Sequence, residues 1–264
     1  LWEYFGNQSQ PEEGKIARDS AKVNPQAISI HYHLGFPAND VINDQNPHDH
    51  SGRTFYYGIR DAARLAIDGE ALDTVRWETW ATQRYGERIL RNSPFEIAIN
   101  RPTTSQTTLS VSATITALEN FNRSVILQVV VIDTAVTVDG NIFYNVMRKM
   151  LPDAAGTFRA NAWAKGETQT LEFDWDYGDL DPSGFKVVVF VQDYDNKEVY
   201  QAQITRQTVN QRPQGGGEIT SLKPIPNSLP LQVFPNPVTK VLKVNLPLRS
   251  HSGKVLRWQV VALN

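Results

Sequence analysis

The first 91 residues alternate between strand-like and helix-like patterns of hydrophobic and polar positions. Residues 1–5 are an apolar strand, and residues 27–34 alternate apolar with polar side chains, which is the period of a half-buried strand. Residues 64–67 predict another short strand, which an Asp-Gly turn pair closes. Residues 11–23 begin with a proline and two acids, as helices often do, and residues 77–90 carry the spacings of an amphipathic helix. This order of elements predicts an α/β domain.

From Pro94 the pattern changes to the two-residue period of β-strands. Apolar side chains alternate with serine and threonine between residues 109 and 117, and residues 125–132 are an apolar run that only Gln128 interrupts. Residues 186–191 and 198–205 flank a polar turn and predict a hairpin. Many short strands separated by turn signals predict an all-β, immunoglobulin-like sandwich.

The composition changes again after the sandwich. Residues 208–230 are polar and rich in proline and glycine, which is typical of a flexible linker. Alternation returns at residues 242–246, but roughly 35 residues seldom bury enough surface to fold alone. We therefore expect an α/β domain at 1–92, the sandwich at 93–207, the linker, and part of a further β domain at 231–264.

Composition limits the function classes. The chain has 264 residues, of which 41% are hydrophobic and 20% charged, as in globular proteins. Its net charge of −2 provides no positive field for nucleic acid, and no stretch approaches the roughly 18 apolar residues of a membrane-spanning helix. We expect neither a nucleic-acid partner nor a direct membrane span. The absence of cysteine excludes thiol catalysis and disulfides, and the start at Leu1 agrees with a removed leader peptide.

Three stretches together resemble the outer-membrane-protein-28-related family of Bacteroidota. That family has a thioredoxin-like domain whose redox motif follows its opening strand, and this segment here reads Asn7, Gln8, Ser9, Gln10. The block at residues 51–69 matches the approach to the strand that usually keeps a cis-proline, and Ala63 takes that place. Because a thiolate is the nucleophile of disulfide exchange, the resemblance implies a thioredoxin-like fold with a degenerate redox site. Blocks at 145–152 and 188–199 carry the likeness into the sandwich.

Residues 231–264 resemble the first half of the C-terminal sorting domain of type IX secretion. Its hallmark start reads Phe234, Pro235, Asn236, Pro237. The resemblance implies export and attachment to the cell surface or outer membrane, or release. It also implies protein partners there, among them the secretion machinery or an outer-membrane barrel complex. The missing closing strands leave open whether the tail is trimmed, truncated or completed by a partner.

Four of the five histidines lie between residues 31 and 50. His31 and His33 share one face of the predicted strand, about 6.6 Å apart along it, and a predicted loop holds His48 and His50. One interpretation is a zinc-like site built from all four. The other is that the strand histidines form hydrogen bonds while the loop histidines are solvated, with no resident cofactor.

Two acidic clusters offer oxygen ligands of the kind that calcium prefers. Neither has the full spacing of a known calcium loop, so ordinary hydrogen-bonded turns are expected. The clusters are Asp193, Asp195, Asn196 and Glu198, and separately Asp174, Asp176, Asp179 and Asp181.

No catalytic signature is present in the sequence: neither Gly-x-Ser-x-Gly nor His-Glu-x-x-His occurs. The leading hypothesis is a non-catalytic surface protein, either a subunit of an outer-membrane assembly or a binding module. A metal-dependent or carbohydrate-acting enzyme that uses residues 31–50 is one alternative. A thiol-free, chaperone-like peptide binder is another.

Overall fold

The computed structural model describes residues 1–9, 27–71, 86–88, 90–100, 102–160, 162–206, 232–234 and 243–245, and every structural statement below concerns these residues. The chain divides into two compact units, Leu1–Arg212 and Pro213–Asn264, and each is considered by itself. The expected linker at 208–230 lies outside the described residues, as do the expected helix at 11–23 and most of the one at 77–90.

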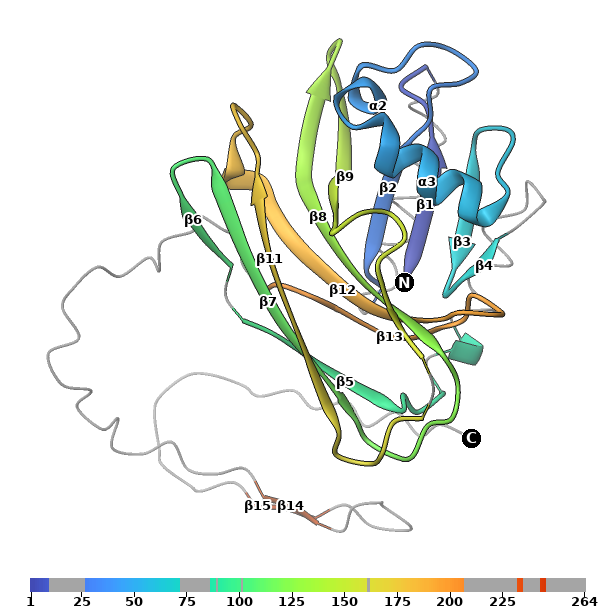
Figure 1. The fold of residues 1–264 in the computed structure, drawn as a ribbon, viewed down its shortest axis with the longest axis vertical. Coiled ribbons are helices and arrows are strands. Elements are labelled where there is room, and N and C mark those ends of the chain that lie inside the picture. Colours follow the sequence, from blue (N-terminus) through green and yellow to red (C-terminus); the bar gives the residue numbers. More distant parts are fainter. Residues whose placement is uncertain are drawn as a thin grey trace, which may run out of the picture. The chain divides into compact units, whose positions relative to one another are not determined.

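The first unit consists mainly of two β-sheets (Figure 1). The larger is a mixed sheet of nine strands in the order β13-β12-β8-β9-β2-β1-β3-β4, with β10 paired to β8. Its strands are β1 (Trp2–Gly6), β2 (Ser29–His33), β3 (Arg64–Ile67), β4 (Glu70–Ala71), β8 (Val125–Val138), β9 (Asn141–Leu151), β10 (Thr157–Arg159), β12 (Phe185–Asp193) and β13 (Val199–Ile204). The smaller sheet has the order β11-β7-β5 with β6 paired to β7, and comprises β5 (Phe95–Ile99), β6 (Thr103–Ser105), β7 (Thr108–Ala117) and β11 (Thr168–Asp176).

The expectation of a thioredoxin-like α/β domain followed by a separate immunoglobulin-like sandwich is wrong. Strands β1 to β4 belong to the same sheet as β8, β9, β12 and β13, because β2 pairs in parallel with β9 at His31 and Val146. In the long β8–β9 hairpin, β9 provides a strand edge. The N-terminal strands pair with this edge and extend the sheet. A single continuous sheet therefore crosses position 92, where the sequence pattern changes.

Strands β8 and β12 lie in the middle of this unit, and both of their faces are buried. Leu127 and Val189 point into an apolar core shared with β5, β7 and β11. Val130 and Phe190 point to the opposite face, where they pack with Phe5 and other residues of the N-terminal strands. A strand covered on both sides favours apolar residues on both faces, which explains why residues 125–132 of β8 are apolar at every position except Gln128.

Two helices with defined ends, α2 (Val41–Gln45) and α3 (Pro47–Tyr57), pack beside the N-terminal strands (Figure 1). Asp40 caps α2 by accepting hydrogen bonds from the backbone N–H groups of Ile42 and Asn43. Asn46 caps α3, and Pro47 occupies its first turn. A short 3₁₀ turn, Pro182–Gly184, precedes β12.

In the second unit, β14 (Gln232–Phe234) pairs antiparallel with β15 (Lys243–Asn245). Of the predicted sorting signal, Phe234 lies in β14, whereas Pro235, Asn236 and Pro237 lie outside the described residues.

Candidate functional site

The structure brings three of the four predicted histidine ligands together at one corner of the larger sheet. His31 and His33 lie on the same face of β2, and their rings stack with centroids 4.2 Å apart. His50 reaches this corner from α3, where its Nδ1 accepts a hydrogen bond of 3.1 Å from the backbone N–H of His33. All three side chains are buried, whereas His48 is exposed.

Asp40 is the centre of this corner, and the sequence did not single it out. Its Oδ2 lies 2.8 Å from Nδ1 of His33 and accepts a 2.7 Å hydrogen bond from the backbone N–H of Gln8. Burial alone would raise the pKa of the Asp40 carboxyl, but the hydrogen bonds and charge of His33 and the backbone donors hold it below its usual value. The ionised carboxylate thus keeps the His33 proton on Nδ1.

The predicted degenerate redox segment meets the histidine corner through Asp40. Asn7 fixes the segment, because its Nδ2 donates to the carbonyls of Leu34 and Ala38 at 2.7 Å each. Its Oδ1 accepts from the backbone N–H and the hydroxyl of Ser9. Gln8 accepts from the N–H of Val41. Polar side chains in this segment therefore serve to join β1 to the start of α2.

The remaining two members of the predicted redox site lie apart from this loop. Gln10 is outside the described residues. Ala63 packs against the small apolar cluster of Trp2, Tyr4, Leu65 and Ile67, and the peptide bond that precedes it, Ala62–Ala63, is cis.

Burial keeps His31 and His50 neutral. It lowers the pKa of His31 well below the ordinary value, and the neighbouring His33 and His50 lower it further. Burial also lowers the pKa of His50 to about 3, with His33 acting in the same direction. The Nε2 atoms of His31 and His33 are buried without a hydrogen-bond partner in the structure.

The four predicted ligands are not gathered in one cluster, because His48 is exposed whereas the other three are buried. Nearly parallel, stacked rings direct their in-plane lone pairs side by side, so one ion cannot meet His31 and His33 together along both lone-pair directions. In the described part of the chain, no group of three or more histidine or acidic residues is arranged to hold a metal ion.

The segment predicted as a loop around His48 and His50 is the first turn of α3. Its signals were present in the sequence: Asn46 is a favoured cap residue, Pro47 favours the first helical position, and Asp49 is an acid in the first turn. Because helical geometry turns side chains around an axis, it separates the exposed His48 from the buried His50.

The acidic clusters form hydrogen-bonded turns. Asp193 is buried, accepts from the backbone N–H groups of Asp195 and Asn196, and pairs with Arg123 at 2.7 Å. Asp176 accepts from the N–H of Gly178, and Asp181 accepts from the N–H and hydroxyl of Ser183. These contacts fit the turn interpretation of both clusters.

A buried polar network that the sequence did not reveal fastens α3 to the sheet. Arg53 is fully buried and forms a two-pronged pair with Glu3, at 2.8 Å and 3.1 Å. It also donates to Tyr57 at 3.1 Å and to Gln192 of β12 at 2.9 Å. Although burial alone would lower it, the pKa of Arg53 is raised, because the charge of Glu3 stabilises the cation.

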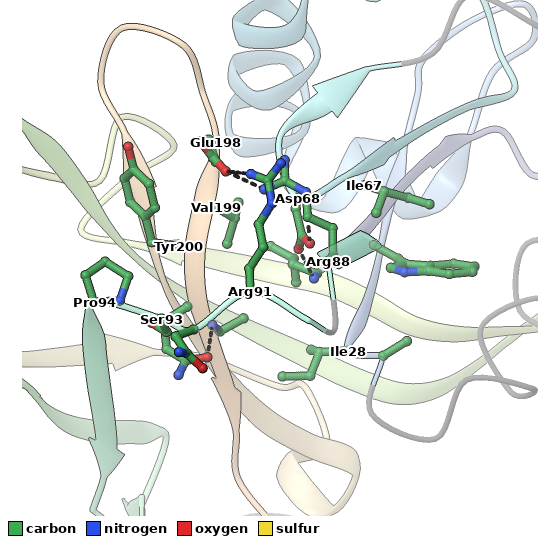
Figure 2. A pocket seen from close by; sticks show the side chains of 16 residues that line it. Ile28, Ile67, Asp68, Arg88, Arg91, Ser93, Pro94, Glu198, Val199 and Tyr200 are labelled. Carbon is green, nitrogen blue, oxygen red and sulfur yellow. Dashed lines mark hydrogen bonds and ion pairs between the residues drawn. The ribbon is translucent and has the colours of Figure 1, made fainter. Parts of the chain in front are cut away.

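A further candidate site is a cleft of about 390 Å³ near the start of β1 and β13 (Figure 2). On one side lie Ile28 and Ile67, and on another lie Tyr200 and Pro94. Its full lining is Leu1, Trp2, Ala27, Ile28, Ile67, Asp68, Arg88, Arg91, Asn92, Ser93, Pro94, Glu198, Val199, Tyr200, Gln201 and Ala202. Of the residues that the sequence singled out for a site, Glu198 of one acidic cluster is the one among them.

Two arginines converge on one carboxylate in this cleft (Figure 2). Arg88 pairs with Glu198, and Arg91 reaches the same carboxylate oxygen at 2.8 Å. Arg91 is 61% exposed, so its guanidinium also faces solvent. Asp68 lies 3.8 Å from Arg88. The cleft thus combines apolar walls with opposite charges that are already paired.

Close packing of two turns forms one end of the cleft. Val199 donates its backbone N–H to the carbonyl of Asp68 at 2.9 Å. A Cβ added to Gly69 would lie 1.6 Å from the carbonyl oxygen of Lys197, and the φ of Gly69 is +90°. Only glycine fits both the backbone conformation and the approach of the turn.

None of the helices in the described part of the chain has the length and apolar character needed to cross a bilayer.

Comparison with known proteins finds only partial similarities to solved structures. No protein-family model and no curated protein matches the chain. A domain of the outer membrane lipoprotein Omp28 from Porphyromonas gingivalis is similar over 44% of this chain and 89% of its own, with 15% identity and a TM-score of 0.32. A calcium-binding mutant of Bacteroides uniformis β-glucuronidase 2 is similar over 42% of this chain and 12% of its own, with 12% identity and a TM-score of 0.25. A β-glucosidase from Kluyveromyces marxianus is similar over 46% of this chain and 16% of its own, with 13% identity and a TM-score of 0.26. Each similarity thus covers less than half of this chain.

Proposed function

We propose that this protein is an exported, non-catalytic protein of the cell surface or outer membrane that serves as a binding or structural subunit of an assembly. The observation that carries the proposal is the cleft beside β13, which is open to solvent and lined by apolar, aromatic and arginine side chains. Tyrosine, tryptophan and arginine are the residues that contribute most to protein–protein binding. The cleft is therefore suited to a protein partner.

The use of the buried polar groups supports a scaffold function. Asp40 and His50 bind backbone N–H groups, and the Glu3–Arg53 pair joins β1 to α3. These groups hold secondary-structure elements in register and are enclosed by the fold. Because these buried groups are already engaged within the fold, a partner would bind at the open cleft.

Export to the cell surface rests on the likeness of residues 234–237 to a type IX sorting signal. Surface digestion tests it: protease added to intact cells should degrade the full-length protein, and Phe234→Ala should protect it by trapping it in the periplasm. Pro224→Ala, a change in the preceding segment, should leave the protein accessible. Equal protection of the unchanged protein and the Phe234→Ala variant would contradict export to the surface.

The binding function is tested by purifying the tagged full chain from membranes of its native cells and identifying partners by mass spectrometry. A partner should copurify at fixed stoichiometry, and Arg91→Ser together with Tyr200→Ala should reduce its recovery. Lys165→Ser, which changes an exposed lysine outside the cleft, is the matched control and should have no effect. A chain that elutes alone, or a substrate turned over by the purified protein, would overturn the proposal.

A further inference from the structure

The outer edge of β13 borders the cleft and carries unpaired ladder positions. β13 pairs with β12 through Gln201 and Gln203, opposite Val191 and Val189. Thr205 donates to the carbonyl of Val187, so the N–H groups of alternate residues face β12. The N–H groups of Ala202 and Ile204 consequently face away from the sheet.

Those two outward N–H groups donate to side-chain oxygens. In a continued sheet, they would donate to the backbone carbonyls of a neighbouring strand. Ala202 donates to the side-chain oxygen of Gln201 at 3.0 Å, and Ile204 donates to that of Gln203 at 3.1 Å. In the described residues, no strand pairs with this edge of β13. Two N–H groups separated by one residue repeat at about 6.6–6.8 Å, which is the spacing of hydrogen bonds to an added strand.

Gln201 also reaches the edge of the second sheet. Its side-chain nitrogen donates to the carbonyl of Phe95 in β5 at 3.2 Å, while its oxygen accepts from Ala202 in β13. The Gln201 side-chain amide thus accepts a hydrogen bond from β13 and donates one to β5. The peptide group of a strand inserted between β13 and β5 would make the same two contacts.

The edge also lacks the usual protection against strand addition. Edge strands are commonly guarded by proline or by charged side chains, and the segment Val199–Ile204 contains neither. A register irregularity near Tyr200 is confined to the start of the strand, before the two outward N–H groups. Val199 at that start already bonds to the carbonyl of Asp68.

We propose that β13 accepts an extended polypeptide segment of a partner protein as an added β-strand, with the Gln201 and Gln203 side-chain amides standing in for it when the partner is absent. The chemistry of the edge selects this occupant, because alternating outward N–H groups are matched by the carbonyls of an extended peptide. The adjoining cleft accepts its side chains between Ile28, Ile67 and Val199. Binding releases the Gln201 amide from Ala202 and from Phe95, so β5 and β13 separate locally. This inference rests on the proposed binding function and specifies its partner class.

The test measures fluorescence anisotropy of a labelled peptide, Lys-Thr-Val-Thr-Val-Thr-Val-Lys, with the full chain. The peptide should bind, and the same peptide N-methylated at alternate residues should bind at least tenfold more weakly, because it has lost ladder hydrogen bonds. Ala202→Pro, which removes one outward N–H at a position where an edge strand tolerates proline, should weaken binding about tenfold. Gln201→Ala should strengthen it about threefold or more, because no amide must be displaced.

Gln169→Ala is the matched control, since Gln169 lies on β11, an edge strand of the other sheet. It should leave the affinity unchanged. Circular dichroism and thermal melting establish that Ala202→Pro remains folded, and the N-methylated peptide tests the proposal on the unaltered protein. No binding, equal binding of the N-methylated peptide, or full affinity in folded Ala202→Pro overturns strand addition. If a partner copurified equally well with the Ala202→Pro variant, the proposed binding function would stand, but strand addition at β13 would not be its mode of binding.

Discussion

The two faces of strands β8 and β12 are both buried, but they are held by different physical means. One face packs Leu127 and Val189 against the smaller sheet in a hydrophobic cluster, with the buried Asp193 at its end paired to Arg123. The other packs Val130 and Phe190 against the N-terminal strands, and ends at Gln192 in contact with the buried Arg53. The first face is thus held mainly by hydrophobic packing, and the second by hydrophobic packing together with the hydrogen bonds of Arg53.

The difference shows how the N-terminal elements acquire a unique position. Apolar burial stabilises in proportion to area and tolerates small displacements. A buried guanidinium requires its partners at hydrogen-bond distance, and Arg53 meets Glu3 and Gln192 in only one arrangement. We infer that the apolar face contributes most of the stability and that the polar face fixes the register of α3.

The largest expected effect comes from breaking the polar face. Arg53→Ala leaves the Glu3 carboxylate buried with its charge uncompensated, which should lower the free energy of unfolding by about 3–5 kcal/mol. Urea denaturation followed by circular dichroism measures this change. A loss below about 1 kcal/mol would show that water or another group reaches Glu3.

The double variant Glu3→Leu/Arg53→Met sharpens the same comparison. Replacing both members of a buried ion pair by apolar residues is often nearly neutral, so this variant should be much more stable than Arg53→Ala. One guanidinium nitrogen of Arg53, Nη1, is buried without a partner, which reduces the net contribution of the pair. A double variant as unstable as the single one would contradict a registry function for the network.

The apolar face should respond differently. Leu127→Ala removes buried methyl groups and leaves a cavity, which should cost about 3 kcal/mol. Because no titrating group takes part, the difference from the unchanged protein should be the same at pH 5 and pH 8. Parallel denaturation curves at both pH values measure it, and a pH-dependent difference would show that the two faces are coupled.

The sequence predicted the apolar face well and the polar face poorly. Alternation at residues 109–117 and the apolar run at 125–132 predicted strands that exist as β7 and β8. Such patterns report the burial of apolar residues, which follows the period of a strand. An arginine in a polar helical segment carries no sign of burial, because the carboxylate that compensates Arg53 lies 50 residues away in the sequence, at Glu3.

The error in fold class has a related cause. The predicted domain boundary followed a change of periodicity near residue 93, but strand pairing is decided by edges that meet in space. The parallel pairing of His31 with Val146 joins the two halves in one sheet, and no local pattern shows it. The candidate cleft was missed for the same reason, since Ile28, Arg91 and Tyr200 come from three distant segments.

The histidine corner provides a smaller, pH-dependent test of how the N-terminal elements are held. His50 has a folded-state pKa of about 3, lowered by burial, against about 6.5 when unfolded, so the unfolded chain binds the proton more tightly. Its contribution to stability is complete above pH 6.5 and falls as the pH drops towards 3. At pH 5 the loss from His50 should be about 2 kcal/mol.

Thermal unfolding between pH 8 and pH 5 measures this loss, and His50→Gln is the variant that tests its source. Protonation turns Nδ1 of His50 from an acceptor into a donor, which removes the hydrogen bond from the His33 N–H. Glutamine keeps an acceptor but does not titrate, so the pH dependence should become shallower. An unchanged slope would place the titrating group elsewhere.

The smallest expected effect separates the buried histidines from the exposed one. His48 is exposed and lies on the same helix as the buried His50, so His48→Ala should change the free energy of unfolding by less than about 0.5 kcal/mol. Equimolar zinc should leave the melting temperature of both proteins unchanged, because stacked His31 and His33 rings do not converge on one ion. Stoichiometric zinc by elemental analysis, together with a rise in melting temperature that His48→Ala abolishes, would contradict this geometry. Such a result would mean that β2 and α3 rearrange to bind the ion, and hence that the polar contacts of this corner fix the N-terminal elements less firmly than the Arg53 network does.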